Sequence, residues 1–243
     1  MKMRFDILTL FPEMMEAVLN ESILKRAREK GIIEINCVQI RDFAFNKHRQ
    51  VDDYPYGGGT GMIMQAEPIF KAYESIANEL DYKPYTIFMS PQGKNFKQAD
   101  AKRFAKKKHI VLICGHYEGV DQRVIDKIAD AEISLGDFVL TGGEIAAMAV
   151  VDATSRMIEG VLKEEASYKE ESHYSGLLEF PQYTRPAVWQ GLKVPDVLLS
   201  GNHKLICEWK REMSVFTTYK KKKSLLKKAK LTDAEKEYIK SLD

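Results

Sequence analysis

Short apolar runs rich in β-branched residues alternate with amphipathic segments through the first two thirds of the chain. Such runs predict buried strands, and the segments between them predict helices. Strands are expected at 4–11, 32–40, 84–90, 110–114, 132–135 and 138–140. Helices are expected from Pro12 onward and at 22–30, 65–80, 96–107, 120–128 and 143–156. This alternation indicates an α/β fold.

The stretch 109–144 carries a glycine-bearing turn after each of its three predicted strands. Glycine at such a place allows φ > 0 or the close approach of a ligand or another backbone. A single turn of this kind would be an ordinary strand–helix connection. Three of them, together with Glu118 and Glu144, favour a cleft for a small flat ligand beyond the carboxyl ends of the strands.

The turns of this cleft can hold a purine through backbone amides. The segments expected to supply these amides are Ser90–Gln92, Gly115 and Gly136–Leu140. The residues expected to form apolar walls are Ile113, Val139 and Leu140. Glu118 is either a partner for a positively charged group or a surface carboxylate.

Two familiar phosphate-binding motifs are missing. A dinucleotide-binding Rossmann fold would place G-x-G-x-x-G after its first strand, whereas this chain has F-P-E-M-M-E. The G-G-G-T-G run at 57–61 is not a P-loop, because no Gly-Lys-Ser/Thr follows it. These absences argue against a Rossmann enzyme and against a P-loop nucleotidase.

Charge is distributed unevenly. The net charge is +2, but residues 201–243 hold twelve Lys and Arg against six Asp and Glu. Such a basic segment is typical of a surface that binds a polyanion, or it is a solvated helix face. The pattern from Val197 onward is helical, and 163–175 is a polar, charged stretch that predicts an interdomain linker.

Composition narrows the class of protein. No apolar run approaches the about 18 residues of a membrane span, and the N-terminus lacks a signal-peptide pattern, so we expect a cytoplasmic protein with no membrane partner. The three cysteines are far apart, which predicts neither a disulfide framework nor a zinc site.

Several motifs, in order along the chain, carry a family resemblance. They are D-Y-P-Y-G-G-G-T-G-M at 53–62, M-S-P-Q-G-K at 89–94, G-H-Y-E-G-V-D-Q-R at 115–123, S-L-G-D-F-V-L-T-G-G-E at 134–144 and G-L-L-E-F-P-Q-Y-T-R-P at 176–186. Together they closely resemble the bacterial tRNA (guanine-N1)-methyltransferases, the TrmD family of the SPOUT class.

The resemblance implies a fold and an assembly. It implies a parallel-sheet α/β domain with a deep trefoil knot over 1–162, a linker over 163–176 and a small helical tRNA-binding domain over 177–243. It also implies an obligate homodimer whose active site is shared between the subunits.

The resemblance further implies that S-adenosylmethionine binds in the cleft and that its methyl group goes to N1 of the guanosine 3′ of the anticodon in tRNA. The cofactor-binding residues implied in this way are Ser90, Pro91, Gln92, Gly115, Tyr117, Glu118, Leu135, Gly136, Asp137, Phe138, Val139, Leu140, Gly142 and Gly143. The family leaves room for a Mg²⁺ requirement, but no carboxylate cluster in the sequence identifies a metal site.

Methylating guanine N1 needs a base for the N1 proton and a cation for the charge that develops on O6. The resemblance assigns the cation to Arg156. The family's aspartate, in an E-D-S pattern, is matched here by Glu171, with Glu170 as an alternative. Without the family, Glu171 would be a solvated linker charge and Arg156 a helix C-terminal cation. His116 also departs from the family, where arginine is frequent.

RNA recognition is expected from the C-terminal helices, from Lys97–Lys108 and from the loop at 41–64, whose basic and tyrosine side chains suit splayed bases. Arg185 is a further candidate. Two rival functions stay open. One is another knotted RNA methyltransferase, which would not need the motifs at 53–62 and 176–186. The other is a catalytically silent RNA-binding protein.

Overall fold

The structure, a computed structural model, describes residues 2–163, 171–174, 176–227 and 229–242. The chain divides into two compact units, residues 1–163 and 164–243, and each is described by itself. Most of the expected linker, including Glu170, lies outside the described residues.

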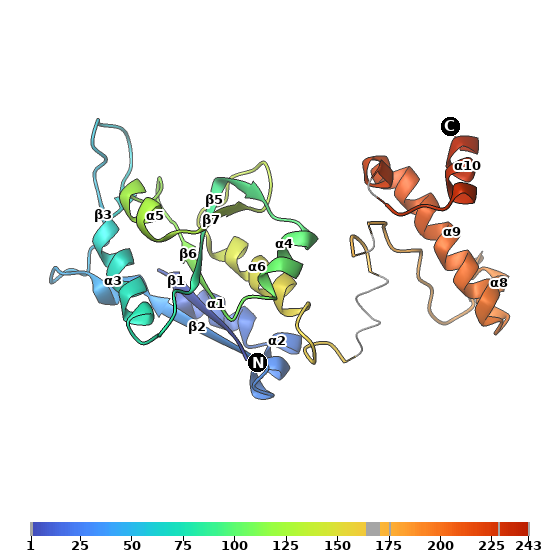
Figure 1. The fold of residues 1–243 in the computed structure, drawn as a ribbon, viewed down its shortest axis with the longest axis horizontal. Coiled ribbons are helices and arrows are strands. Elements are labelled where there is room, and N and C mark those ends of the chain that lie inside the picture. Colours follow the sequence, from blue (N-terminus) through green and yellow to red (C-terminus); the bar gives the residue numbers. More distant parts are fainter. Residues whose placement is uncertain (1, 164–170, 175, 228, 243) are drawn as a thin grey trace. The chain divides into compact units, whose positions relative to one another are not determined.

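Unit 1 is built on a parallel sheet of five strands in the order β2-β1-β6-β5-β7 (Figure 1). The strands are β1 (Met3–Thr9), β2 (Ile33–Gln39), β5 (Tyr85–Asn95), β6 (His109–Cys114) and β7 (Ala131–Ser134). Every residue of the central strand β6 is buried, as expected of an apolar run covered on both faces. The α/β prediction is therefore confirmed, with all neighbouring strands parallel.

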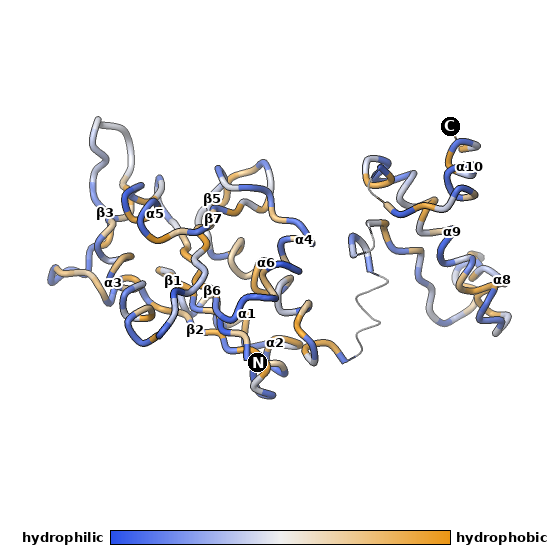
Figure 2. The backbone as a smooth tube through the Cα atoms, viewed as in Figure 1, coloured by the Kyte–Doolittle hydropathy of each residue, from blue (hydrophilic) through white to orange (hydrophobic). Residues whose placement is uncertain are grey.

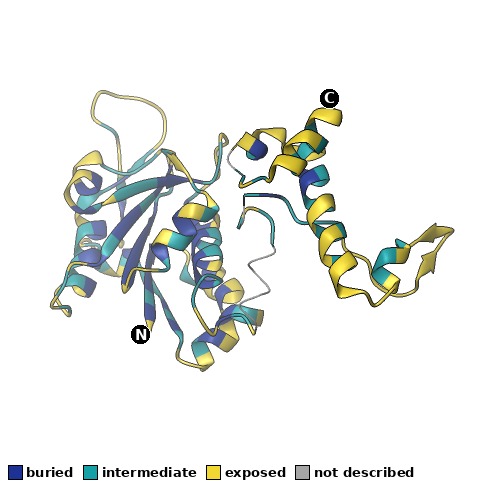
Figure 3. Ribbon diagram, turned by 45° about the vertical axis from the view of Figure 1, so that its right-hand side comes forward, coloured by how far each residue is buried: buried dark blue, intermediate teal, exposed yellow. Residues whose placement is uncertain are grey.

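Helices cover both faces of this sheet (Figures 1 and 3). They are α1 (Pro12–Leu19), α2 (Ser22–Glu29), α3 (Ala66–Ala77), α4 (Gln98–Phe104), α5 (Gln122–Ile128) and α6 (Glu144–Ser155). Side chains of α1, α2, α4 and α6 pack in one core cluster and those of α3 and α5 in the other. Figure 2 shows that apolar and hydrophilic stretches alternate along the backbone of unit 1.

Three predictions about local structure are wrong. Residues 138–140 form an irregular loop rather than a strand, and Val139 is 81% exposed. An apolar side chain in a loop has the same sequence pattern as one in a strand, and only sheet pairing separates them. The turn expected at Pro91–Gly93 lies inside β5, where the register against β7 shifts between Met89 and Lys94. The helix expected over 96–107 is shorter than predicted, because α4 spans only Gln98–Phe104.

Residues 40–64 include the short elements η1 (Ile40–Phe43), β3 (Asp52–Asp53) and β4 (Ile63–Met64), and β3 pairs antiparallel with β4. The chain between β3 and β4 extends away from the sheet in Figure 1 and is mostly exposed in Figure 3. This loop carries the 53–62 motif.

Unit 2 is small and mainly helical. Its elements are β8 (Val188–Trp189), β9 (Leu192–Lys193), α8 (Asp196–Leu199), α9 (His203–Lys222), η2 (Lys223–Lys227) and α10 (Asp233–Ser241). A core of Leu177, Val215 and Leu226 joins α9, η2 and α10. The β8–β9 hairpin was not predicted. The helical pattern expected from Val197 onward is confirmed, as separate helices, and Asn202 and Thr232 cap the starts of α9 and α10 with their side chains.

Candidate functional site

A pocket of about 220 Å³ lies where β6 and β7 end and α6 begins, beside residues 88–91 in the middle of β5. Eleven of the residues predicted to bind the cofactor line it: Ser90, Pro91, Gly115, Tyr117, Glu118, Leu135, Phe138, Val139, Leu140, Gly142 and Gly143. Eight lining residues were not among them: Phe88, Met89, His116, Gly119, Ile133, Ser134, Thr141 and Ala146. The structure therefore brings segments 88–91, 115–119 and 133–146 to one place.

Three predicted residues do not line the pocket. The backbone N–H of Gln92 donates to Ser90 Oγ at 3.2 Å. Gly136 is hydrogen-bonded through its backbone to the Ser134 hydroxyl, and Asp137 accepts a hydrogen bond from Asn95 at 3.3 Å. Ile113, expected as a wall, is fully buried against the α3 and α5 face, so that expectation is wrong.

Glycines bring two of the pocket segments into direct contact. The N–H of Gly143 donates to the carbonyl of Gly115 at 2.8 Å. A Cβ on Gly143 would lie 2.8 Å from Cys114 Cα. A Cβ on Gly142 would meet the Glu144 and His116 side chains. The start of α6 therefore reaches the end of β6 only because these positions lack a side chain.

Glu144 is a buried carboxylate next to the pocket. It is 3% exposed and accepts a hydrogen bond of 2.8 Å from Thr9 Oγ1 at the end of β1. It stands in the first turn of α6, where a negative charge is favoured by the helix dipole. Burial, and then Glu144, raise the pKa of the neighbouring Cys114 thiol. That thiol is therefore a core group rather than a nucleophile.

The turn at 116–119 is held by the end of the 53–62 motif and the strand after it. The N–H of Glu118 donates to Met62 O at 3.0 Å, and the N–H of Met64 donates to Gly119 O at 2.9 Å. A Cβ on Gly61 would lie 2.5 Å from Glu118 Cγ. The pocket turn and the glycine-rich loop are consequently one structural unit.

A second, larger hollow of about 720 Å³ opens beside this turn. Its lining includes Asp53, Tyr54 and Tyr56 from the glycine-rich loop, and Tyr56 is fully exposed. Cations stand at its edge, where Arg123 pairs with Asp121 at 2.7 Å and Lys127 lies over the Phe70 ring. Exposed rings beside charged groups are the residue types that hold unstacked RNA bases.

The two predicted catalytic residues belong to different units. Arg156 caps the C-terminus of α6, with its N–H donating to Asp152 O at 3.1 Å. Glu171 lies in unit 2, where its carbonyl accepts from the Tyr174 N–H at 3.3 Å. The same turn is closed by His173 N–H to Leu177 O at 2.8 Å. Because Leu177 is part of the unit 2 core, Glu171 is fixed to that unit.

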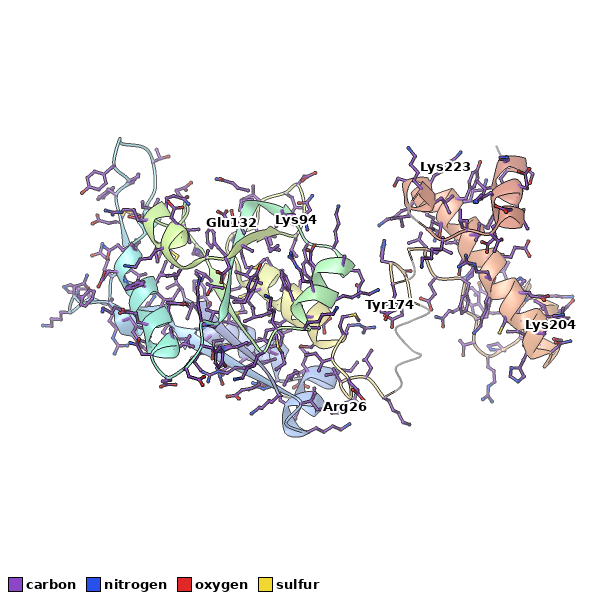
Figure 4. All side chains as sticks on the ribbon, in the orientation of Figure 1. Arg26, Lys94, Glu132, Tyr174, Lys204 and Lys223 are labelled. Carbon is purple, nitrogen blue, oxygen red and sulfur yellow. The ribbon has the colours of Figure 1, made fainter. Side chains whose placement is uncertain are left out.

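Unit 2 combines lysines with aromatic rings. Lys210 lies over the Phe180 ring, and Trp209 contacts both Phe180 and Tyr183. Lys223 lies over Tyr219, and Figure 4 shows Lys204 and Lys223 at opposite ends of α9. This arrangement matches the basic and aromatic surfaces that contact nucleic acids.

Among the described residues, no helix is long and apolar enough to span a membrane. Within the same residues, no group of three or more His, Cys, Asp or Glu side chains is arranged to hold a metal ion.

Known proteins match nearly the whole chain. The model of the family described as tRNA (Guanine-1)-methyltransferase TrmD matches residues 3–228. Proteins named tRNA (guanine-N(1)-)-methyltransferase are similar at full length. That of Carboxydothermus hydrogenoformans is 54% identical over 234 residues, covering 96% of this chain and 91% of the relative. That of Alkaliphilus oremlandii is 52% identical over 245 residues, covering 99% of this chain and 98% of the relative.

Proposed function

We propose, because this chain belongs to the tRNA (guanine-1)-methyltransferase family TrmD, that it transfers a methyl group from S-adenosylmethionine to N1 of the guanosine 3′ of the anticodon in tRNA. The observation that carries the proposal is the pocket at the carboxyl ends of β6 and β7, beside the middle of β5. It is built from the family motifs at 89–94, 115–123 and 134–144. Ligands of open α/β sheets bind at this edge.

The pocket fits the methyl donor. Its lining is mainly apolar, and its turns present backbone amides beside glycines that leave room for close approach. Glu118, exposed at the rim, can meet the donor's ammonium group. S-adenosylmethionine bound there would supply an electrophilic methyl group. Phe138, Val139 and Leu140 are exposed apolar side chains that can cover the adenine ring.

We assign the proton transfer to Glu171. Its carboxylate would take the N1 proton of guanine. The electron pair left on N1 would form the bond to the methyl carbon as the carbon–sulfur bond of the sulfonium breaks and the neutral thioether leaves. A positioned base of this kind contributes about 10²- to 10⁴-fold. Arg156 stabilises the negative charge on O6, because a guanidinium donates strong hydrogen bonds to an oxyanion. Glutamate keeps the carboxylate of the family's aspartate and adds one methylene.

The homodimer and the trefoil knot are also part of the proposal. Phe11, Met14 and Val18 are exposed apolar residues on or beside α1, and Ile145 on α6 is exposed as well. An exposed apolar helix face of this kind is suited to a partner subunit. The Phe11 ring lies 5.1 Å from the ring of His116 in the pocket, so a partner on this face would adjoin the site. Support for the knot comes from the family and from the direct contact of segments 115–119 and 142–143.

Transfer of labelled methyl groups to two tRNA transcripts tests the function. One transcript is unmodified, and the other has adenosine in place of the guanosine 3′ of the anticodon. We expect label on the first only. Label on both would favour a methyltransferase that acts elsewhere on RNA. Label on neither, with the methyl donor still bound, would favour a silent RNA-binding protein.

A further inference from the structure

A cluster of lysines and tyrosines lies at the amino ends of β5 and β6, the edge of the sheet opposite the pocket. It surrounds a hollow of about 220 Å³. The lining residues are Tyr82, Lys83, Pro84, Tyr85, Lys107, Lys108, His109 and Asp130. Lys106 adjoins it and is exposed, as are Lys107 and Lys108. We call residues Tyr82–Tyr85 and Lys106–Lys108 the amino-edge surface.

The lysines of this surface are placed on aromatic rings. Lys107 Nζ lies 4.2 Å from the centroid of the Tyr85 ring, and Lys108 Nζ lies 4.0 Å from that of Tyr82. A cation–π contact orients an ammonium group without neutralising it. Among the described residues, no salt bridge involves Lys106, Lys107 or Lys108. The charges of Lys107 and Lys108 are therefore held in place, and all three charges are available to an anion.

A buried network fixes the Tyr82 ring. Its hydroxyl is hydrogen-bonded to His109 Nδ1 at 3.3 Å, and His109 Nε2 is 2.5 Å from Asp6 Oδ2. Asp6 and His109 are 1% and 2% exposed. Arg4 completes the network by donating to Asp6 at 2.8 Å. The Tyr82 ring, over which Lys108 lies, is thus anchored to the core of unit 1.

One carboxylate in the hollow opposes these charges. Asp130 is paired with Lys83 at 2.7 Å and accepts the Thr86 N–H at 2.9 Å. Asp81 lies in the preceding loop and is exposed. With Asp130 balanced by Lys83, Lys106–Lys108 give the surface a positive charge.

We propose that the amino-edge surface binds backbone phosphates of the substrate tRNA, away from the base that is methylated. This inference rests on the proposed function for the identity of the RNA. The tyrosine faces lie under ammonium groups, so they are not free to stack on bases, and the contacts are to phosphates without sequence preference. β6 runs from this surface to the pocket. Its six residues, at roughly 3.3 Å each, separate the two by about 20 Å.

Binding of tRNA by the full-length protein tests the inference. The test variant is Lys106→Gln, Lys107→Gln and Lys108→Gln together. The matched control is Lys25→Gln, Arg26→Gln and Lys30→Gln, which removes the same charge from exposed positions on and just after α2 (Figure 4 labels Arg26). Filter binding is measured over a range of salt concentrations, with the transcripts that carry guanosine and adenosine 3′ of the anticodon.

We expect the test variant to bind both transcripts at least about tenfold more weakly than wild type. We also expect the slope of log affinity against log salt concentration to become shallower by about 2 to 3. Each lost phosphate contact reduces the magnitude of this slope by about 0.7 to 0.9, and the variant loses three lysines. Wild-type affinity and slope in the test variant, or an equal loss in the control, would overturn the inference. Loss confined to the guanosine transcript would also overturn it. If wild type itself fails to methylate tRNA, the proposed function fails separately.

Discussion

At the residue scale, the pocket depends on positions where no side chain fits. Gly143 is one of them, because its hydrogen bond to Gly115 brings its Cα against the backbone of Cys114. Gly136 is also crowded, but the atoms near it belong to the Phe138 ring, which is 55% exposed and free to turn. The two glycines therefore differ in what an added methyl group would displace.

We predict that Gly143→Ala lowers the free energy of unfolding by about 2 kcal/mol and weakens binding of S-adenosylmethionine, since the backbone of β6 must move. Gly136→Ala should cost less than about 1 kcal/mol, because only the Phe138 ring must move. Urea unfolding and calorimetric titration measure the two effects. Equal costs at both positions would contradict this account of the pocket.

The pocket residues that stand in distinctive motifs, such as Gly115, Glu118 and Gly142, were predictable from the sequence. Met89 and Ile133 were not, because an apolar residue in a strand has the same pattern whether it faces a core or a pocket. Ile113 was misplaced for a related reason. Side chains alternate along a strand, so Leu112 and Cys114 face the α6 side while Ile113 faces α3 and α5.

At the scale of elements, Asp6 joins the three strands β1, β2 and β6. It is hydrogen-bonded to Asn36 on β2 at 2.9 Å and to His109 on β6. Burial would raise the pKa of Asp6, but hydrogen bonds from His109, Arg4 and Asn36 outweigh it and hold the pKa below its ordinary value. This stabilisation is present above the ordinary carboxyl pKa of about 4 and is lost as pH falls through the lower folded-state value.

We predict that Asp6→Asn destabilises the protein by about 3 kcal/mol at pH 7, since it breaks a buried charged network. The difference from wild type should shrink as the pH falls below the ordinary carboxyl pKa and through the lower folded-state pKa, where the wild-type carboxylate is protonated as well. Urea unfolding at several pH values measures this. The control, Lys2→Ala, removes an exposed ion pair with Glu34 and should cost less than about 1 kcal/mol. A difference that stays constant with pH would contradict the assignment.

The strands and helices with clear periodicity were predictable, and those fixed by pairing were not. β6 was evident from its apolar run, and α1 from proline at its first position. The continuation of β5 through Pro91 was not, because it depends on Gly93 packing against the backbone of Glu132 and Ile133 in β7. Residues 188–193 likewise form a hairpin only through pairing of β8 with β9.

At the scale of the whole molecule, the proposed chemistry needs residues from both units. Arg156 ends α6 in unit 1, and Glu171 is anchored to the core of unit 2 through the turn that reaches Leu177. The family resemblance places the two in one site that is shared between subunits. The family motifs identify Arg156 and Glu171 as catalytic partners. The hydrophobic and charge pattern alone could not, because a linker glutamate and an arginine at a helix end are common surface residues.

We predict that mixing Arg156→Ala subunits with Glu171→Ala subunits restores methyl transfer. In a mixed dimer with a shared site, one of the two sites contains both intact residues. Each variant alone should be inactive in the same assay, and size-exclusion chromatography should show that both form dimers. No recovery in mixtures that form mixed dimers would mean that each site is built from a single chain.

The single-turnover rate of methyl transfer from S-adenosylmethionine to tRNA tests whether Glu171 is the base. The rate of wild type is compared with those of Glu171→Gln and Glu171→Asp. Glutamine has the shape of glutamate but cannot accept the proton, so we predict a loss of about 10²- to 10⁴-fold with unchanged binding of the methyl donor. Aspartate, the family's residue, should keep activity within about tenfold of wild type. A Glu171→Gln variant as fast as wild type would contradict the assignment of Glu171 as the base.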